Sequence, residues 1–356
     1  MRVAFVLGTT SGGTGRHVRM LADGLIAKGH QVVVAGPPEV GELFGFDGAG
    51  ARFAGIPVSD RPHPRNDLRA VAALRRVTRQ ADVVHAHGLR AGALAALAGL
   101  GRRGAPLVVT LHNALTAGGF VGAVYGVLER VVARRADHVL VVSPDLGERM
   151  RALGARDVRP AVVPAPVPRP AARAAGDVLE ELGARGRPLV LTVARLAQQK
   201  GLETLLDVAA TYPGPLYAVA GEGPLRVELQ ESVDRRELPV VLLGNRDDVP
   251  DLLAAASVVL WPSRWEGMPL SLSEALMAGR PVVATAVGGI PDLVGDAGTL
   301  VPYGDVEATS SAVREIVEDA ERAADRARAA ARRGAELPGA GDAVRAVLDV
   351  YETRED

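Results

Sequence analysis

Short apolar runs alternate along the chain with longer segments in which apolar residues recur at the period of a helix. In the first half, the apolar runs occupy residues 3–7, 32–35, 83–85, 107–111 and 139–142. In the second half, they occupy residues 189–193, 216–219, 240–243, 258–260, 281–284 and 299–301. Runs of this length predict buried strands, and their alternation with helical segments predicts parallel sheets with helices on both faces.

A proline-rich segment separates the two series. Residues 160–170 can continue neither a helix nor a central strand, because their prolines lack the backbone donor and fix their own φ. We therefore predict two doubly wound, Rossmann-like α/β domains that face each other across a cleft. The expected limits are 1–163 for the first domain, 164–172 for the linker, 173–338 for the second domain and 339–356 for a last helical segment.

Composition and charge narrow the range of functions. The 356 residues suffice for two domains, and a hydrophobic content of 48% can supply a core for each. A net charge of −1 gives no general argument for a nucleic-acid partner. Cysteine is absent, which excludes disulfides and thiolate metal sites and fits a reducing cytoplasm. No stretch reaches the roughly 18 uninterrupted apolar residues of a membrane-spanning helix, and residues 1–8 read as a first strand rather than a signal peptide.

The segment between residues 257 and 289 carries the strongest functional pattern. Glu266 lies in the loop after an apolar run, and Glu274 lies in the short helix that follows. Open α/β sheets bind ligands at the carboxyl ends of their strands, and a helix N-terminus attracts an anion such as a diphosphate. Carboxylates that flank this anion suit hydroxyl groups, which indicates a sugar on one side of the phosphate group and a ribose on the other.

Two basic residues follow the first predicted strand of the second domain. Arg195 and Lys200 share one loop, and Lys200 stands out because all but two of the 41 basic side chains are arginine, a bias that indicates GC-rich codons. A forked guanidinium and a compact ammonium suit a departing diphosphate, whose negative charge grows as the glycosidic bond breaks. The chain contains no Asp-x-Asp motif. We therefore expect these cations and helix N–H groups, rather than a metal, to neutralise the leaving group.

Together these motifs resemble those of one enzyme family. Glu-Gly-x-Pro-Leu at 266–270, Ala-Gly-x-Pro-Val-Val-Ala-Thr at 278–285 and Arg-Leu-x-x-x-Lys-Gly at 195–201 are similar to the retaining, nucleotide-sugar-dependent glycosyltransferases of family 4. The resemblance implies the GT-B fold, with an acceptor-side first domain, a donor-binding second domain and a last helix that returns to the first domain. It also implies metal-independent transfer of a sugar from a nucleoside diphosphate to a hydroxyl acceptor, with retained configuration and a front-face mechanism.

The resemblance also assigns roles to individual residues. It implies that the catalytic residues are His112, Arg195, Lys200 and Glu266. The implied donor-binding residues are Gly13, Gly221, Glu222, Asn245, Arg246, Gly267, Met268, Pro269, Leu270 and Glu274. We expect Glu274 to hold the donor ribose and Glu266 the transferred sugar, while Asn245 and Arg246 approach the base. No resident cofactor or metal is expected, and the nucleoside-diphosphate sugar, with UDP or GDP as its nucleotide, acts as co-substrate.

Three histidines lie at or just beyond predicted strand ends. His85 and His87 belong to Val-Val-His-Ala-His-Gly, and His112 follows the next predicted strand. We expect His85 and His87 to point to opposite faces of the strand, and no third ligand of matching placement is visible, which disfavours a zinc site. The resemblance supports His112 as a residue near the reacting end of the sugar and favours packing as the role of His85.

A glycine-rich turn at residues 11–17 follows the first predicted strand and opens a helix. Backbone can approach a phosphate closely at such a turn, although a purely structural turn fits the sequence nearly as well. The turn lacks the full Gly-x-Gly-x-x-Gly spacing, and no acidic residue ends the next strand, which disfavours a dinucleotide cofactor. The resemblance places Gly13 against the donor phosphates or the acceptor.

Alternatives remain for the function and for the partners. A sugar-nucleotide 2-epimerase and a non-catalytic nucleotide-sugar-binding protein share the expected architecture. Residues 164–168 read Pro-Ala-Pro-Val-Pro where the family usually has Pro-Asn-Gly-Val-Asp, so a turn residue is missing there. Residues 65–79 predict a basic amphipathic helix that suits either an anionic lipid surface or the face of a sheet. We favour a cytoplasmic enzyme with a small-molecule or loosely lipid-linked acceptor over one held at the inner face of the membrane.

Overall fold

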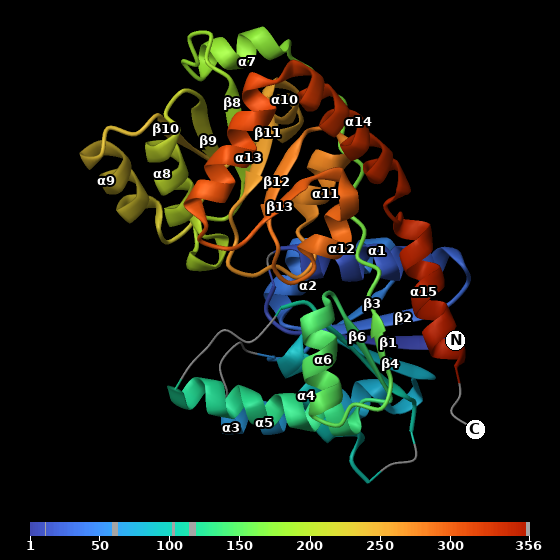
Figure 1. Cartoon of the computed structure of the whole chain (residues 1–356). Coiled ribbons are helices and arrows are strands. Elements are labelled where there is room, and N and C mark those ends of the chain that lie inside the picture. Colours follow the sequence, from blue (N-terminus) through green and yellow to red (C-terminus); the bar gives the residue numbers. More distant parts are fainter. Residues whose placement is uncertain (11, 59–62, 102–103, 114–118, 354–356) are drawn as a thin grey trace. The chain divides into compact units, whose positions relative to one another are not determined.

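The chain forms two α/β units. The computed structural model describes residues 1–10, 12–58, 63–101, 104–113 and 119–353. Unit 1 comprises Met1–Pro164 and Pro338–Asp356, and unit 2 comprises Ala165–Leu337 (Figure 1). The chain thus leaves unit 1 inside the proline-rich segment and returns to it for its last helix.

Unit 1 is built on a parallel sheet of seven strands in the order β3-β2-β1-β4-β5-β6-β7. The strands are β1 (Arg2–Leu7), β2 (Gln31–Gly36), β3 (Arg52–Gly55), β4 (Val83–His87), β5 (Leu107–Leu111), β6 (His138–Val141) and β7 (Val158–Pro160). The sequence pattern missed the edge strands β3 and β7, because neither has a fully buried residue and so neither produces an apolar run. Pro160 can end β7 because this strand lies at the sheet edge.

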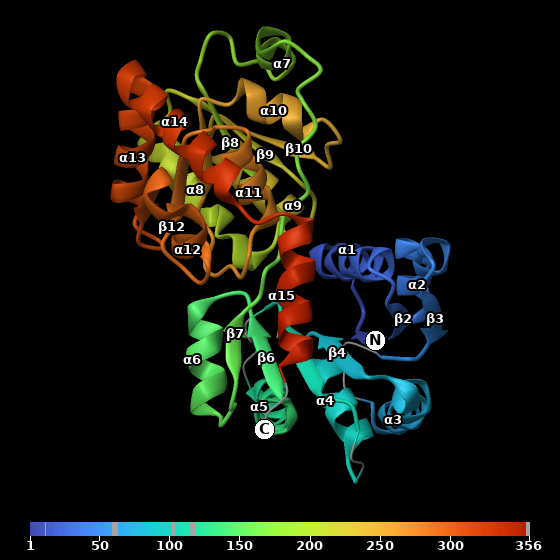
Figure 2. The same ribbon diagram turned by 90° about the vertical axis from the view of Figure 1, so that its right-hand side faces the viewer.

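Seven α-helices and two short 3₁₀ segments accompany the described strands of unit 1. They are α1 (Gly13–Ala27), α2 (Pro38–Phe44), η1 (Phe46–Ala49), α3 (Pro64–Val77), η2 (Thr78–Gln80), α4 (Leu89–Gly99), α5 (Gly119–Arg135), α6 (Pro144–Ala152) and α15 (Ala340–Glu352). The last helix, α15, lies against α1 (Figure 2). Gly24 of α1 allows this approach, since a Cβ at Gly24 would lie 2.4 Å from Cγ2 of Val344.

Unit 2 is built on a parallel sheet of six strands in the order β10-β9-β8-β11-β12-β13. The strands are β8 (Leu189–Val193), β9 (Leu216–Ala220), β10 (Val240–Gly244), β11 (Val258–Trp261), β12 (Val282–Thr285) and β13 (Thr299–Val301). The connecting helices are α7 (Ala175–Glu181), η3 (Gln198–Lys200), α8 (Leu202–Thr211), α9 (Arg226–Arg235), α10 (Val249–Ala255), α11 (Leu270–Met277), α12 (Ile290–Val294), η4 (Gly295–Ala297), α13 (Val306–Glu318) and α14 (Ala320–Glu336). Each predicted strand of this half is present, and separate apolar clusters pack on the two faces of the sheet.

Both sheets reverse their strand order once. The reversal lies between β1 and β4 in unit 1 and between β8 and β11 in unit 2. Loops leave the carboxyl ends of two such strands in opposite directions, which opens a crevice where doubly wound sheets bind ligands. In the part of the chain that the structure describes, no helix is long and apolar enough to cross a membrane.

Candidate functional site

In unit 2, a buried carboxylate lies just beyond the end of β11. The Glu266 side chain is buried, and its Oε1 accepts hydrogen bonds from Lys200 Nζ at 2.5 Å and from Ser263 Oγ at 2.8 Å. Lys200 comes from η3, after β8, so the ion pair joins the two loops that flank the strand-order reversal. A buried carboxylate needs such partners because an unpaired charge away from water is strongly destabilising.

Residues at the end of β12 and just after it hold the Glu266 loop in place. Thr285 Oγ1 donates a hydrogen bond to the Ser263 carbonyl at 2.6 Å, and the Gly289 N–H donates to the Glu266 carbonyl at 3.0 Å. Gly288 has a φ of +54°, and a Cβ there would lie 1.9 Å from the Glu266 carbonyl oxygen. Only glycine fits this close approach and this backbone conformation. Thr285, Gly288 and Gly289 therefore fix the position of Glu266.

Helix α11 begins immediately after this loop. Pro269 is its N-cap, Leu270 is its first residue, and Glu274 lies half-buried within it. Ser271 Oγ donates a hydrogen bond to the Val193 carbonyl at 3.1 Å, which ties the first turn of α11 to the end of β8. The N–H groups of a first helical turn have no partners inside the helix, so this end of α11 can receive an anion.

The loop that carries Arg195 packs against the loop after β9. The N–H groups of Ala194 and Leu196 donate hydrogen bonds to the carbonyls of Ala220 and Glu222, both at 3.0 Å. Gly221 has a φ of +145°, and a Cβ there would lie 2.0 Å from the Ala194 carbonyl oxygen. This contact requires glycine at position 221 and leaves the Arg195 side chain exposed at the carboxyl end of the sheet.

Asn245 and Arg246, which we expect to approach the base of the nucleotide, follow β10. Arg246 donates two hydrogen bonds to the Asp248 carboxylate, at 2.7 and 2.6 Å, and a third to Glu181 at 3.0 Å. The guanidinium of Arg246 lowers the pKa of the Asp248 carboxyl. Asn245 is exposed beside it. The structure thus brings the loop residues of unit 2 to one edge of the sheet, with Arg246 already bound by carboxylates.

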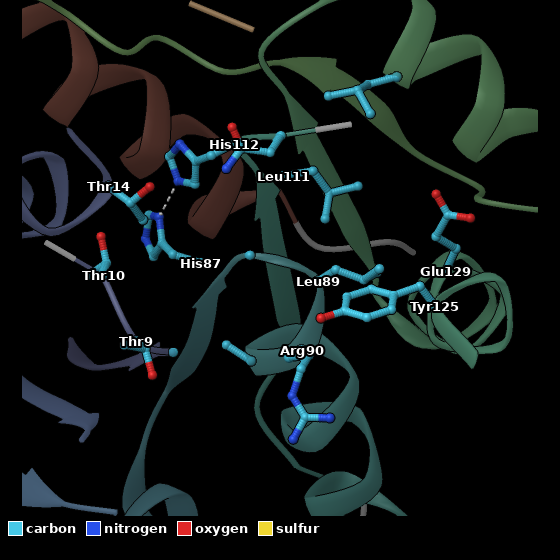
Figure 3. Close-up of a pocket in the computed structure, with 15 residues that line it drawn as sticks. Thr9, Thr10, Thr14, His87, Leu89, Arg90, Leu111, His112, Tyr125 and Glu129 are labelled. Carbon is cyan, nitrogen blue, oxygen red and sulfur yellow. Dashed lines mark hydrogen bonds between the residues drawn. The ribbon is translucent and has the colours of Figure 1, made fainter. Parts of the chain in front are cut away.

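In unit 1, a cavity of about 300 Å³ lies at the carboxyl ends of β1, β4 and β5. Figure 3 shows Thr10, Thr14, His87 and His112 on one side of this cavity and Tyr125 and Glu129 on the other. Glu129 is buried, and its carboxylate accepts two hydrogen bonds from Arg149 at 2.7 and 2.6 Å. The cavity therefore presents hydroxyl, imidazole and phenol groups, and His112, which we predicted to lie near the reacting end of the sugar, is one of its lining residues.

Four histidine rings gather beside this cavity, and all are neutral at pH 7. His87 Nδ1 lies 3.0 Å from His112 Nε2, and the His17 ring meets both of these rings edge-on with centroids 5.7 Å away. His85 hydrogen-bonds Tyr351 through Nδ1 at 2.6 Å and Thr110 through Nε2 at 2.7 Å. Burial lowers the pKa of His17 to about 4 and that of His112 to about 3, and it lowers the pKa values of His85 and His87 strongly.

One expectation about these histidines was wrong. His85 and His87 do not point to opposite faces, since their rings stack with centroids 4.3 Å apart. Side chains alternate along a strand, so residues two apart share a face. The expectation that His85 is packed is confirmed, because it is fully buried and both of its ring nitrogens are hydrogen-bonded.

The glycine-rich turn and the basic helix are partly as expected. Gly13 is the first residue of α1, while Ser11 lies outside the described residues. Helix α3 is amphipathic, with Ala70 and Leu74 buried, but Leu68 is 72% exposed rather than part of the packed face.

Sequence reasoning missed several residues at these two sites. The sequence pattern does not single out Ser263, Tyr125 or Glu129, and it includes Thr14 and His17 only as members of the turn at residues 11–17. Ser263 could have been found, because it lies three residues before Glu266 after the same apolar run. Tyr125 and Glu129 carry no local signal, since only the fold brings α5 to the cavity.

Comparisons with known proteins cover both halves of the chain. Residues 12–166 match the model of the glycosyl transferase 4-like domain, and residues 187–319 match that of the glycosyl transferases group 1. The chain is 34% identical over 295 residues to the 2-deoxystreptamine N-acetyl-D-glucosaminyltransferase of Streptomyces fradiae, which covers 72% of this chain and 67% of the relative. It is 29% identical over 271 residues to the alpha-D-kanosaminyltransferase of Streptomyces kanamyceticus, covering 67% and 68% of the two chains.

Solved structures share the fold over the full length. The crystal structure of Anabaena HepE in complex with UDP has a TM-score of 0.83 and 21% sequence identity, and the match covers 98% of this chain and 99% of that chain. A chain with two successive doubly wound α/β domains has the GT-B fold. The chain therefore belongs to the two-domain GT-B glycosyltransferases of the family 4 type and is a glycosyltransferase.

Proposed function

We propose that this glycosyltransferase moves a sugar from a nucleoside diphosphate, UDP or GDP, to a hydroxyl acceptor with retained configuration and without a metal. The Lys200–Glu266 ion pair, placed beside the start of α11 at the strand-order reversal of unit 2, is the observation that carries this proposal. It combines a cation for a diphosphate, a carboxylate for sugar hydroxyls and helix N–H groups for an anion in one corner.

The donor diphosphate is neutralised by protein groups. Lys200 is one-fifth exposed, so its ammonium can turn from Glu266 toward a phosphate oxygen while Ser263 still donates to Glu266. Exposed Arg195 and the first turn of α11 add a guanidinium and N–H donors. These groups stabilise the charge that develops on the leaving diphosphate, which is the largest electrostatic change in the reaction.

The reaction balances without a protein nucleophile. The acceptor hydroxyl oxygen bonds to the anomeric carbon on the face from which the diphosphate leaves, and the carbon–oxygen bond to the phosphate breaks. The departing phosphate oxygen takes the acceptor proton, which gives the glycoside and the nucleoside diphosphate. The strongly lowered pKa of His112 makes this residue a weak base. His112 is therefore assigned to binding the sugar rather than to removing the proton.

The partners are proposed from the site and from the relatives. HepE has been crystallised with UDP and with UDP-glucose, which supports a uridine nucleotide as the donor here. The two Streptomyces relatives are named for transfer of aminosugars, one of them to 2-deoxystreptamine. A cavity of about 300 Å³ lined by hydroxyl and imidazole groups suits a small polyhydroxylated acceptor in unit 1.

Hydrolysis of candidate nucleotide sugars tests the proposal without knowledge of the acceptor. UDP- and GDP-sugars are incubated with the enzyme in EDTA, and proton NMR follows the released sugar before it mutarotates. We expect slow release of the nucleoside diphosphate together with the anomer that matches the donor. Release of the opposite anomer would contradict retention, and turnover that requires added magnesium or manganese would contradict the metal-free site. Conversion of the nucleotide sugar into its 2-epimer would instead identify an epimerase.

A further inference from the structure

The hydrogen bond between His87 and His112 joins two rings that are both neutral. Their nitrogens lie 3.0 Å apart, and burial lowers the pKa of each ring well below its ordinary value. A neutral imidazole carries one N–H and one bare nitrogen. One ring must therefore donate and the other accept. The position of the proton on the His87 ring consequently decides which nitrogen of His112 carries its proton.

The contacts around His87 hold its ring in one orientation. Its ring stacks on His85, which is held by hydrogen bonds to Thr110 and Tyr351, and it meets the His17 ring edge-on. His87 itself lies in strand β4 and is almost fully buried. His112, in contrast, follows β5 in a non-regular segment and is only half-buried. The better-fixed ring is thus the one that orients the other.

The second nitrogen of His87 indicates the direction of the bond. Nε2 of His87 is buried and has no hydrogen-bond partner among the described residues. Among buried backbone groups, N–H donors without an acceptor are rarer than carbonyl acceptors that lack a donor, and we apply the same preference to this imidazole. Nε2 therefore carries no proton, and the proton of His87 lies on Nδ1, from which it is donated to His112 Nε2. The remaining proton of His112 then lies on its Nδ1.

We propose that His87 is a positioning residue that holds the His112 ring in its Nδ1–H form, so that His112 presents an N–H donor at the cavity of unit 1. His112 Nδ1 has no partner within the described part of the chain, and both histidines line the cavity. A donor there can bind a hydroxyl or ring oxygen of a sugar. This last step rests on the proposed glycosyltransferase reaction, whereas the protonation state of the two rings does not.

Nitrogen NMR of the full chain labelled with ¹⁵N-histidine tests the assignment directly. Long-range proton–nitrogen correlations show which ring nitrogen carries the proton, and the spectra of His87→Asn and of a His112 variant assign the signals among the seven histidines. We expect the Nδ1–H form for both His87 and His112. Finding both rings in the Nε2–H form would overturn the proposal, and this readout requires no enzymatic activity.

Variants of His87 connect the bond to catalysis. Asparagine at position 87 can place its amide N–H near the position of His87 Nδ1, while leucine removes the donor. We expect His87→Leu to lower the turnover of the nucleotide sugar about tenfold or more, as loss of a residue that orients a catalytic group commonly does. His87→Asn should recover most of this loss, and the donor KM should change less than kcat in both variants.

A neighbouring residue provides the matched control. His85 is equally buried and stacks on His87, but it has no hydrogen bond to His112. His85→Gln should lower stability yet leave the His112 nitrogen signals in the Nδ1–H form. If His87→Leu retains full activity, or if His85→Gln changes the protonated nitrogen of His112 as much as His87→Leu does, the positioning role is wrong. Should His87→Leu fail to fold, the spectrum of the unaltered chain still decides.

Discussion

Glu266 depends on its partners more than any other charged residue at the proposed donor site. Its side chain is 6% exposed against 21% for Lys200, so the carboxylate is the member of the pair that cannot turn to water. Removal of one partner from a buried ion pair typically costs about 3 to 5 kcal/mol, because it leaves a buried charge uncompensated. The partial exposure of Lys200 and the bond from Ser263 reduce that cost here.

The variant Lys200→Ala tests the role of this ammonium in the reaction. We expect kcat for nucleotide-sugar turnover to fall about a hundredfold or more, in line with loss of one preorganised electrostatic contact. EDTA should not change the activity of the unaltered enzyme. Lys28→Ala, which removes the only other lysine, is the control and should keep full activity. Adding Glu266→Gln to Lys200→Ala should restore stability but not turnover. A fall of less than tenfold in kcat for Lys200→Ala would remove Lys200 from the catalytic set.

At this scale, sequence reasoning found residues that share a local motif and missed those that only the fold assembles. Glu266, Glu274 and Lys200 lie in recognisable local motifs, and the structure places all three at the carboxyl end of one sheet. Gly288 belongs to the segment that the sequence pattern marks out, but the pattern does not show why glycine is needed there. The structure does, because Gly288, in the loop after β12, packs against the Glu266 carbonyl in the loop after β11. The Glu129–Arg149 pair joins two helices and has no signal in either segment.

Among the elements, α15 is one whose close packing depends on a single small residue of a neighbouring helix. Helix α1 has glycine at position 24, although alanine is favoured over glycine in a helix by about 1 kcal/mol. The α1–α15 contact explains this choice, because a Cβ at Gly24 would overlap the Val344 side chain. His85 then fixes the far end of α15 through its hydrogen bond to Tyr351.

We predict that Gly24→Ala lowers the free energy of unfolding. The expected loss is about 1 to 3 kcal/mol from overpacking, less the roughly 1 kcal/mol gained in helix propensity. Val344→Ala in the same chain should relieve the overlap, so the double variant should be more stable than the sum of the single changes implies. Gly99→Ala in α4 is the control, since among the described residues no atom outside its own helix and chain neighbours lies within 4 Å of the added Cβ. Denaturant unfolding of the unaltered chain and the four variants measures this, and strictly additive effects of the changes at positions 24 and 344 would contradict the contact.

Strands with a buried apolar run were predictable, and the two edge strands of unit 1 were not. The central strands of both sheets gave runs that the structure confirms, because parallel strands covered on both faces are apolar throughout. The edge strands β3 and β7 present few buried residues, so pairing with a neighbour, rather than local sequence, defines them.

In the whole molecule, all seven histidines belong to unit 1. Burial lowers the pKa values of five of them, and most strongly those of the four rings beside the cavity, whereas the unfolded chain binds protons to histidine near pH 6.5. The unfolded state therefore binds more protons as the pH falls below about 6.5, and unit 1 loses stability. The loss is about 1.4 kcal/mol per pH unit for each of these four rings, until the pH approaches the folded pKa values.

Hydrogen exchange at two pH values tests this asymmetry between the units. Between about pH 6.5 and 5.5 the histidines titrate in the unfolded chain, while its carboxylates, with ordinary pKa values of about 4, stay almost fully ionised. We therefore expect the protection of amides in the β1, β4 and β5 strands of unit 1 to fall across this window, after correction for intrinsic exchange. The strands of unit 2 should change little and serve as the internal control. Equal losses in both units would show that histidine burial is not the cause.

In the proposed reaction, the corner around α11 holds a nucleoside diphosphate without a metal. Calorimetric titration of UDP and GDP in EDTA measures this with the unaltered chain, Glu274→Ala and Glu266→Ala. We predict binding of one nucleotide in EDTA. Its affinity should fall about tenfold to a hundredfold in Glu274→Ala, as loss of a charged hydrogen bond implies, and change little in Glu266→Ala. Binding that appears only with added metal, or equal losses in the two variants, would contradict the account.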